Sequence, residues 1–566
     1  MEPPMQHNHI GQPTAPGIWF TNEEFYWRSL ASGVWLMLFL PVILITFTLM
    51  VNFSLFSPVT WISGFLSLSV SLSTIGFCIL WQACSVLLTI FQSRALSVSK
   101  TVHSTNWKFF LHMLNPKQLV NTICTLMVAL VSSVILLQFY LPNTNSNRDN
   151  LNSEERNFVL LYSLFLGVSL SLTYYRKHEY ITQFPVVQQK RFFRVKKALG
   201  PCLLESVSCS FKMLRLYYPV YILIGVLPQS VLSFVFGYDM NSFFMLGTVW
   251  NLCNLSLFWL CFTMSIAVVF TFKISNCFLQ ICNTQHYTFP IVAALATDQG
   301  KTLGEAMESS NPLLKSLAFH DYLHLSQSKG PRRLQLFELS SPGNQPHVWN
   351  KISAECLRML DSLRSRLVAA IEQKQQSRTP QQVSSPVAAV GMRNLFSPTA
   401  EQESARIKKP QWSSPGRVST KTQESVYEVA SQSKDMNSKV KKSCEIFGDF
   451  QLLLCCIEGL SNLVAASIKE DKYGVVQRKL PDILSKLLSL LQECENYTRI
   501  SVTPSTLSTS DDVETARLNA WNASSLKLAL KTGLYGITTA FSYHIGAVRL
   551  TAEHKKRLNA FLEFVE

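Results

Sequence analysis

The N-terminal half of the chain is dominated by long apolar stretches without charge. From Ser29 to Ser93 there is no charged side chain and no histidine. As a single helix this stretch would be about 98 Å long, roughly three times the ~30 Å hydrocarbon thickness of a bilayer. It therefore predicts two membrane crossings. The turn between them is expected at residues 52–61, where Asn52, Pro58 and several hydroxyl residues interrupt the apolar run.

Four further uncharged stretches follow, and each is long enough for one span of ~20 residues. The pattern therefore predicts six membrane-spanning helices in all. Their expected positions are Gly33–Val51, Phe65–Phe91, Leu119–Leu141, Phe158–Tyr175, Leu216–Gly237 and Leu246–Phe272.

The basic residues of the short loops predict the orientation of these spans, because positively charged loops resist translocation. The loops after the second and fourth spans hold 4 and 9 Lys and Arg residues, 13 in total, whereas the loops after the first, third and fifth hold only Arg148 and Arg156. Both termini are therefore expected on the cytoplasmic or nucleoplasmic side. The 14 cysteines are scattered without CxxC spacing, which is typical of small buried residues rather than of disulfides or zinc ligands.

Apolar residues alternate with serine at the start of the second predicted span, between Leu66 and Ser73. On a helix, Ser67 and Ser71 would stack on one side and Ser69 and Ser73 on nearly the opposite side. Both faces would then allow close helix packing. The alternative is that each serine is tolerated in lipid because its hydroxyl bonds back to its own helix.

The loop between the fourth and fifth spans is the most basic one and interleaves cations with aromatic residues. A helix lying flat on a membrane would sink the aromatic rings into the headgroups, while each cation gains about 1 kcal/mol from anionic lipid. The basic and aromatic residues of this loop are therefore candidates for binding to a membrane surface. The alternative is that they only set the topology of the spans, and nucleic-acid binding is the least favoured interpretation. They are Lys190, Arg191, Phe192, Phe193, Arg194, Lys196 and Lys197.

The composition changes after Phe272: charged residues become frequent, and the apolar residues follow a helical periodicity. This pattern predicts soluble, amphipathic helices. Apolar residues recur at three- and four-residue steps in Asn311–Gln373, Ile446–Glu470, Gly474–Asn496 and Ser524–Val565. The broad apolar stripe of the third of these helices must be covered by neighbouring helices or by a partner protein.

The predicted fold class is all-α: a polytopic membrane protein with six transmembrane helices, followed by a soluble helical region that a disordered linker interrupts. The linker is rich in Ser, Thr, Gln and Pro and holds 12 Lys and Arg against 5 Asp and Glu. The expected parts are an N-terminal cytoplasmic segment (1–30), the membrane domain (31–272), a helical segment (273–373), the linker (374–442) and a C-terminal helical domain (443–566).

Motifs for enzymatic chemistry are missing from the sequence. There is no P-loop, GxSxG, HExxH or GxGxxG motif, so we predict no catalytic, metal or cofactor site and no small-molecule substrate. His320 and His324, next to Asp321, have helical spacing that a metal could use, but a pair of surface histidines is the simpler interpretation.

Several stretches resemble the transmembrane nucleoporins of the nuclear division cycle protein one family, in their animal form. The resemblance implies a structural component of the nuclear pore complex in the pore membrane. It would tether soluble nucleoporins, among them ALADIN and the membrane-binding inner-ring nucleoporins, and support pore assembly. The matching stretches are Gln183–Arg194, Leu317–Gln327, Glu458–Gln477 and Ala552–Phe564.

Candidate partner-binding residues lie in and just after the third of these stretches: Glu458, Gly459, Asp471, Tyr473, Gly474, Val475, Val476 and Pro481. Two other functions remain open at this stage. A small-molecule transporter or channel with a regulatory tail would fit the number of spans, although the spans lack the charged residues that coupled transport usually needs. A membrane-bound enzyme is the weakest alternative, because no catalytic constellation is visible.

Overall fold

A computed structural model of the chain describes residues 19–51, 59, 61–63, 65–66, 71–98, 106–140, 153–185, 188–224, 255–293, 300–339, 343–376, 446–501 and 510–563. Within these ranges the regular structure is helical, apart from one isolated parallel bridge between Ser97 and Ile181. The predicted all-α fold is therefore confirmed. Most of the expected linker lies outside the described residues.

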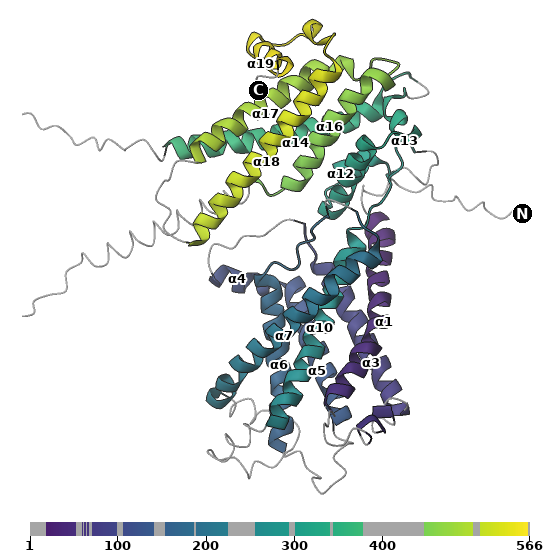
Figure 1. The fold of residues 1–566 in the computed structure, drawn as a ribbon, viewed down its shortest axis with the longest axis vertical. Coiled ribbons are helices and arrows are strands. Elements are labelled where there is room, and N and C mark those ends of the chain that lie inside the picture. Colours follow the sequence, from purple (N-terminus) through teal and green to yellow (C-terminus); the bar gives the residue numbers. More distant parts are fainter. Residues whose placement is uncertain are drawn as a thin grey trace, which may run out of the picture. The chain divides into compact units, whose positions relative to one another are not determined.

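Long apolar helices from the N-terminal half pack into one bundle (Figure 1). Helix α1 packs on α10 and α3, α5 packs on α3 and α6, and α7 packs on α10. Their bounds are α1 Tyr26–Val51, α3 Leu72–Ala95, α5 Pro116–Tyr140, α6 Ser153–Arg176, α7 Arg191–Ile224 and α10 Leu255–Asn283, with the short helix α4 (Asn106–Met113) before α5.

Six helices in the described part of the chain are long and apolar enough to cross a membrane. Five of them, α1, α3, α5, α6 and α10, correspond to predicted spans. The sixth, α16 (Phe450–Glu470), lies in the C-terminal half and packs on α12 (Pro312–Gln327). The predicted fifth span, 216–237, begins inside α7, and its second half lies outside the described residues.

The two faces of α1 show why a bilayer suits this bundle. Leu36, Leu40 and Leu44 are buried in the core, in steps of four residues. Leu38 and Val42, on other faces of the same helix, are more than half exposed. A helix that presents large apolar side chains both to its neighbours and to its surroundings is stable when hydrocarbon surrounds it.

Helix α1 begins earlier than the predicted boundary at residue 30. A π-helical turn, Phe20–Phe25, leads into it, and Trp19 and Phe20 are buried. The indole Nε1 of Trp19 donates a 3.0 Å hydrogen bond to Gly300 O, and Lys301 Nζ lies 3.2 Å from a Glu23 carboxylate oxygen. The segment before the first span is therefore fixed to residues that follow the last span.

Helix α10 extends beyond the predicted end of the sixth span at Phe272. Its 29 residues make a rod about 43 Å long, comparable to a bilayer with its headgroup layers. The sequence predicts that the span ends before Lys273, but this lysine lies within the helix and is buried. Its Nζ is 2.5 Å from Glu179 Oε1 and 3.2 Å from Glu205 Oε1, so two carboxylates compensate the buried charge of Lys273.

The C-terminal half forms further helices, and many of their apolar side chains are buried. Helix α12 packs on α16 and on the short helix α11 (Leu303–Glu308). The other helices are α13 Pro331–Leu334, α14 His347–Gln376, α17 Leu480–Ser501, α18 Ser510–Ala540 and α19 Ala552–Leu562. The single helix expected over Ser524–Val565 is thus two helices, and Thr551 caps the second by accepting a hydrogen bond from His554 N.

Candidate functional site

The last membrane helix is joined to the C-terminal helices by a short segment, residues 284–293, which we call the strap. Asp321 on α12 holds it. The Oδ2 atom of this carboxylate accepts a 3.0 Å hydrogen bond from Phe289 N, and His286 Nε2 lies 3.2 Å from Oδ1. The Asp321 side chain is completely buried, so the strap is fixed where it crosses α12.

Arg332, on α13, completes this attachment. Its guanidinium pairs with both oxygens of Asp321 and also donates a hydrogen bond to Phe289 O. Burial alone would raise the pKa of the Asp321 carboxyl, but the adjacent His286 ring and the hydrogen bonds from Arg332 and Phe289 N hold that pKa below its usual range. The carboxylate therefore stays ionised at neutral pH, and one side chain ties α12, α13 and the strap together.

A second connection comes from the residues just before α7. His320 Nε2 lies 3.1 Å from Pro185 O, and Gln451 Nε2 on α16 donates a 2.6 Å hydrogen bond to Phe184 O. The rings of Phe184 and His320 are also in contact. The loop between α6 and α7 therefore contacts α12, as the strap does, and also α16.

These contacts change the interpretation of His320, Asp321 and His324. Asp321 binds the strap, His320 contacts Pro185, and the ring of His324 packs on that of His286 at 4.9 Å between centroids. The described residues contain no group of His, Cys, Asp and Glu that could hold a metal ion. The contacts of these three residues join α12 to the strap and to the loop before α7.

The predicted membrane-surface residues divide into two groups. Arg194 donates to Thr284 Oγ1 at 2.8 Å and to Ile281 O at 3.4 Å, and Arg191 donates to Gln285 Oε1. Both arginines thus contact the carboxyl end of α10. The remaining five, Lys190, Phe192, Phe193, Lys196 and Lys197, are exposed at the start of α7.

The predicted partner-binding residues also divide. Gly459, Val475 and Val476 are buried and belong to the packing of the fold. Asp471 shapes the turn after α16, since it accepts hydrogen bonds from Tyr473 N and Val476 N, and Gly474 has a positive φ of 65°. Glu458 and Tyr473 are exposed, while Pro481 and Gly474 are partly buried.

The serine-packing prediction for the second span falls mostly outside the described structure. Ser67 and Ser69 are not among the described residues, and nothing is described of the Ser73 side chain. Ser71 has an extended backbone at the start of α3, with ψ of 137°. A small residue allows two helices to pack closely at another place in the bundle, between α5 and α6. A Cβ on Gly167 of α6 would lie only 2.8 Å from Leu126 Cα of α5, so the absence of a side chain there permits the contact.

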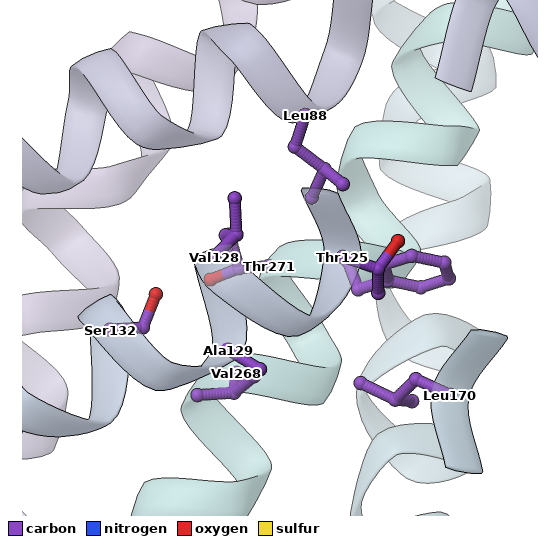
Figure 2. Close-up of a pocket in the computed structure, with 9 residues that line it drawn as sticks. Leu88, Thr125, Val128, Ala129, Ser132, Leu170, Val268 and Thr271 are labelled. Carbon is purple, nitrogen blue, oxygen red and sulfur yellow. The ribbon is translucent and has the colours of Figure 1, made fainter. Parts of the chain in front are cut away.

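A small pocket lies where α3, α5, α6 and α10 meet (Figure 2). The hydroxyls of Thr125 and Thr271 on its wall donate hydrogen bonds to their own helices, at 2.8 Å in each case. The rest of the wall is mainly apolar: Leu88, Val128, Ala129, Ser132, Leu170, Val268 and Phe272. This pocket is a packing gap of the bundle and offers no charged group to a solute.

Arg28 is the residue that sequence reasoning missed. It lies near the start of α1 and donates from Nη1 to Gln285 O at 2.8 Å and to Asn283 O at 3.4 Å, at the end of α10. Its position directly before a 65-residue uncharged stretch was the available signal, but only the fold shows its partner.

These features define an all-helical, multi-pass membrane protein in which the segment after α10 is bound to α12 and α13. We call the helices of the C-terminal half, α11–α19, the module. The family model described as Nucleoporin protein Ndc1-Nup matches residues 25–559. The chain therefore belongs to the Ndc1-Nup nucleoporin family, and the resemblance noted in the sequence is confirmed.

Individual relatives agree with this assignment along nearly the whole chain. Nucleoporin NDC1 of Homo sapiens is 26% identical over 95% of this chain and 97% of its own length. Nucleoporin NDC1 of Danio rerio is 28% identical over 97% of this chain and 99% of its own. Nucleoporin Ndc1 of Drosophila melanogaster is 22% identical over 91% and 94%, respectively.

Proposed function

We propose that this nucleoporin is a structural membrane anchor of the nuclear pore complex. The helical bundle fixes it in the pore membrane, and the C-terminal module tethers soluble nucleoporins and supports pore assembly. The alternative of a transporter or channel had the span count in its favour. Membership of a nucleoporin family accounts for the same spans, and the pocket within the bundle adds no support for transport.

The observation that carries this proposal is the attachment of the module to the last span. An anchor must transmit load from its partners to the bilayer, so its soluble part must be held firmly by its membrane part. The buried Asp321 carboxylate, its bonds to Phe289 and Arg332, and the contacts of Phe184 and Pro185 with α16 and α12 provide two such attachments.

Among the candidate partner-binding residues, Glu458 and Tyr473 have the exposure that contact with a partner requires. Tyr473 is 57% exposed on the turn after α16. Large aromatic residues on a polar surface are common anchors of protein interfaces. The soluble partners proposed for this surface are ALADIN and the membrane-binding inner-ring nucleoporins.

The exposed start of α7 adds a membrane contact outside the spans. Phe192 and Phe193 are both more than half exposed, and Lys190, Lys196 and Lys197 lie beside them. This arrangement suits insertion of the rings among headgroups, with the amines near anionic lipid. It also agrees with both termini lying on the cytoplasmic or nucleoplasmic side.

The proposal is tested with a tagged full-length chain in cells. We expect staining of the nuclear rim and recovery of soluble nucleoporins with the tagged protein. Removal of residues 447–566 should release these partners while the shortened chain resists carbonate extraction. Spread of the intact protein over the plasma membrane, or unchanged recovery after the truncation, would contradict the proposal.

A point variant tests the surface itself. Tyr473→Ala should reduce recovery of soluble nucleoporins, because it removes an exposed ring without touching the core. Tyr543→Ala is the matched control, since Tyr543 is 96% exposed but lies between α18 and α19. Equal recovery with both variants would remove Tyr473 from the interface.

A further inference from the structure

Three arginines from two helices meet at the carboxyl end of α10: Arg28 of α1, and Arg191 and Arg194 of α7. We call them the arginine cluster. Arg28 and Arg191 both bond to Gln285, one to its main-chain oxygen and the other to its side-chain oxygen. Arg194 bonds to the adjacent Thr284 and to Ile281 O. Three guanidinium groups are thus held around five consecutive residues.

The charges in this cluster do not balance within the described chain. One carboxylate pairs with it there: a Glu24 oxygen lies 3.6 Å from Arg28 Nε. The carbonyl groups at the end of α10 supply the equivalent of about half a negative charge. Together they offset about half of the positive charge of three guanidinium groups, so the site favours an anion.

The exposed member of the cluster is suited to bind that anion. Arg191 is exposed at the surface, and in the described structure it uses one of its five N–H donors, for the bond to Gln285. A guanidinium with its other donors turned to solvent can bind a phosphate in a bidentate manner. Arg28, with 12% of its side chain exposed, bonds to the same Gln285 and adds positive charge where water is partly excluded.

The surroundings of the cluster indicate a lipid source for the phosphate. Exposed aromatic residues flank it on both helices: Tyr26 and Trp27 precede Arg28, and Phe192 and Phe193 follow Arg191. Aromatic side chains gather at headgroup depth in membrane proteins. The length of α10, about 43 Å, also brings its end to that depth if its other end lies in the opposite headgroup layer.

We propose that the arginine cluster is a binding site for the phosphate of one anionic phospholipid headgroup. The site deepens the proposed membrane anchoring and rests on it only for the presence of a bilayer. It differs from a diffuse basic surface, because it requires Arg191 and Arg28 and does not require Lys196 or Lys197. A lipid bound there would contact α1, α7 and α10 at once and so stabilise the bundle at the side where the strap begins.

The test uses the purified full-length protein in nanodiscs and counts retained lipids by native mass spectrometry. The discs contain phosphatidylcholine alone, or phosphatidylcholine with phosphatidylserine or with phosphatidylinositol 4-phosphate. We expect one anionic lipid to be retained at least fivefold more often than phosphatidylcholine. Equal retention of all headgroups by the unmodified protein would overturn the proposal, whatever the variants do.

Variants identify the residues. Arg191→Gln keeps an amide donor for Gln285 but removes the charge, and it should lower the selective retention at least fivefold. The double variant Lys196→Gln/Lys197→Gln removes two charges from the same stretch of helix and should change it less than twofold. A larger loss in the lysine variant would show a diffuse surface and overturn the site. Arg191→Lys should restore only part of the selectivity, because an ammonium group cannot form the bidentate pair.

A final arm separates a lipid from a soluble phosphate. Millimolar inorganic phosphate should leave the bound lipid in place, because the flanking aromatic residues favour a ligand within the bilayer. Displacement of the lipid at that concentration would overturn the assignment to a lipid. The tether to soluble nucleoporins can hold or fail independently of this result, because lipid retention is measured without those partners.

Discussion

Substitution of Gly459 by alanine tests the packing that organises the C-terminal module. Gly459 lies on α16 against Tyr322 of α12, and both residues are buried. A Cβ at this position would lie 2.3 Å from Tyr322 Cε1 and 2.7 Å from Cδ1. Carbon atoms normally pack at about 3.5–4.0 Å. The alanine therefore requires the two helices to separate by more than about 1 Å, or the tyrosine ring to turn.

The magnitude follows from two opposing effects. Overpacking of a well-packed core costs about 1–3 kcal/mol, and here the ring has little freedom because Tyr322 is fully buried. Alanine within a helix recovers about 0.5–1 kcal/mol relative to glycine. The net loss expected for Gly459→Ala is therefore about 1 kcal/mol, between limits of about 0 and 2.5 kcal/mol. For domains of 150–250 residues this lowers the melting temperature by about 2–4 °C for each kcal/mol.

Thermal unfolding of the full-length protein in detergent, followed through tryptophan fluorescence, measures this effect. Gly536→Ala on α18 is the matched control, because a Cβ there has no neighbour within 4 Å. The control should keep or raise the melting temperature through the gain in helix propensity. An unchanged melting temperature in Gly459→Ala would refute the close contact of α12 and α16. Loss of nucleoporin binding without loss of stability would instead assign Gly459 to the interface.

Two further substitutions probe the strap and the bundle. Asp321→Asn should destabilise the module by about 3 kcal/mol, because it leaves a partly buried Arg332 without its carboxylate, and thermal unfolding at neutral pH measures the loss. The folded pKa of Asp321 is lowered, so the stabilisation from its carboxylate is present above the unfolded pKa of about 3.9 and is lost as the pH falls through the folded pKa. The Asn variant should lack this acid-dependent loss of stability. Identical dependence of stability on acid pH in both proteins would refute the role of Asp321. In the bundle, Gly167→Ala should weaken the packing of α5 on α6, whereas Gly76→Ala should not, because a Cβ on Gly76 has no neighbour within 4 Å. Resistance to denaturation by SDS compares the two variants. Equal resistance would refute close α5–α6 packing.

The sequence predicts the membrane bundle well, because an apolar run of about 20 residues without charge is typical of a helix that crosses a bilayer. It is less accurate where charges are paired inside the protein. The expected sixth span ends before Lys273, yet α10 continues to Asn283, because Glu179 and Glu205 compensate the lysine. Such pairing joins residues 94 and 68 positions apart, and no local pattern indicates it.

Tertiary contacts also assign roles that spacing alone leaves open. Asp321 and its neighbouring histidines have a spacing that a metal could use, but the fold gives them the strap and Pro185 as partners. Gly459 is a candidate for a partner surface because it lies in a stretch that resembles a known family. Its burial against Tyr322 shows that packing between two helices can account for the glycine.

The short strap limits how far α12 can lie from the end of α10. Phe289, the residue pinned by Asp321, follows the end of α10 at Asn283 by six positions. Six extended residues span about 20 Å at most. A flexible linker of several dozen residues would allow a much larger separation. If the module tethers a soluble nucleoporin as proposed, a partner bound at α12 would be held within a short and nearly fixed distance of the end of α10.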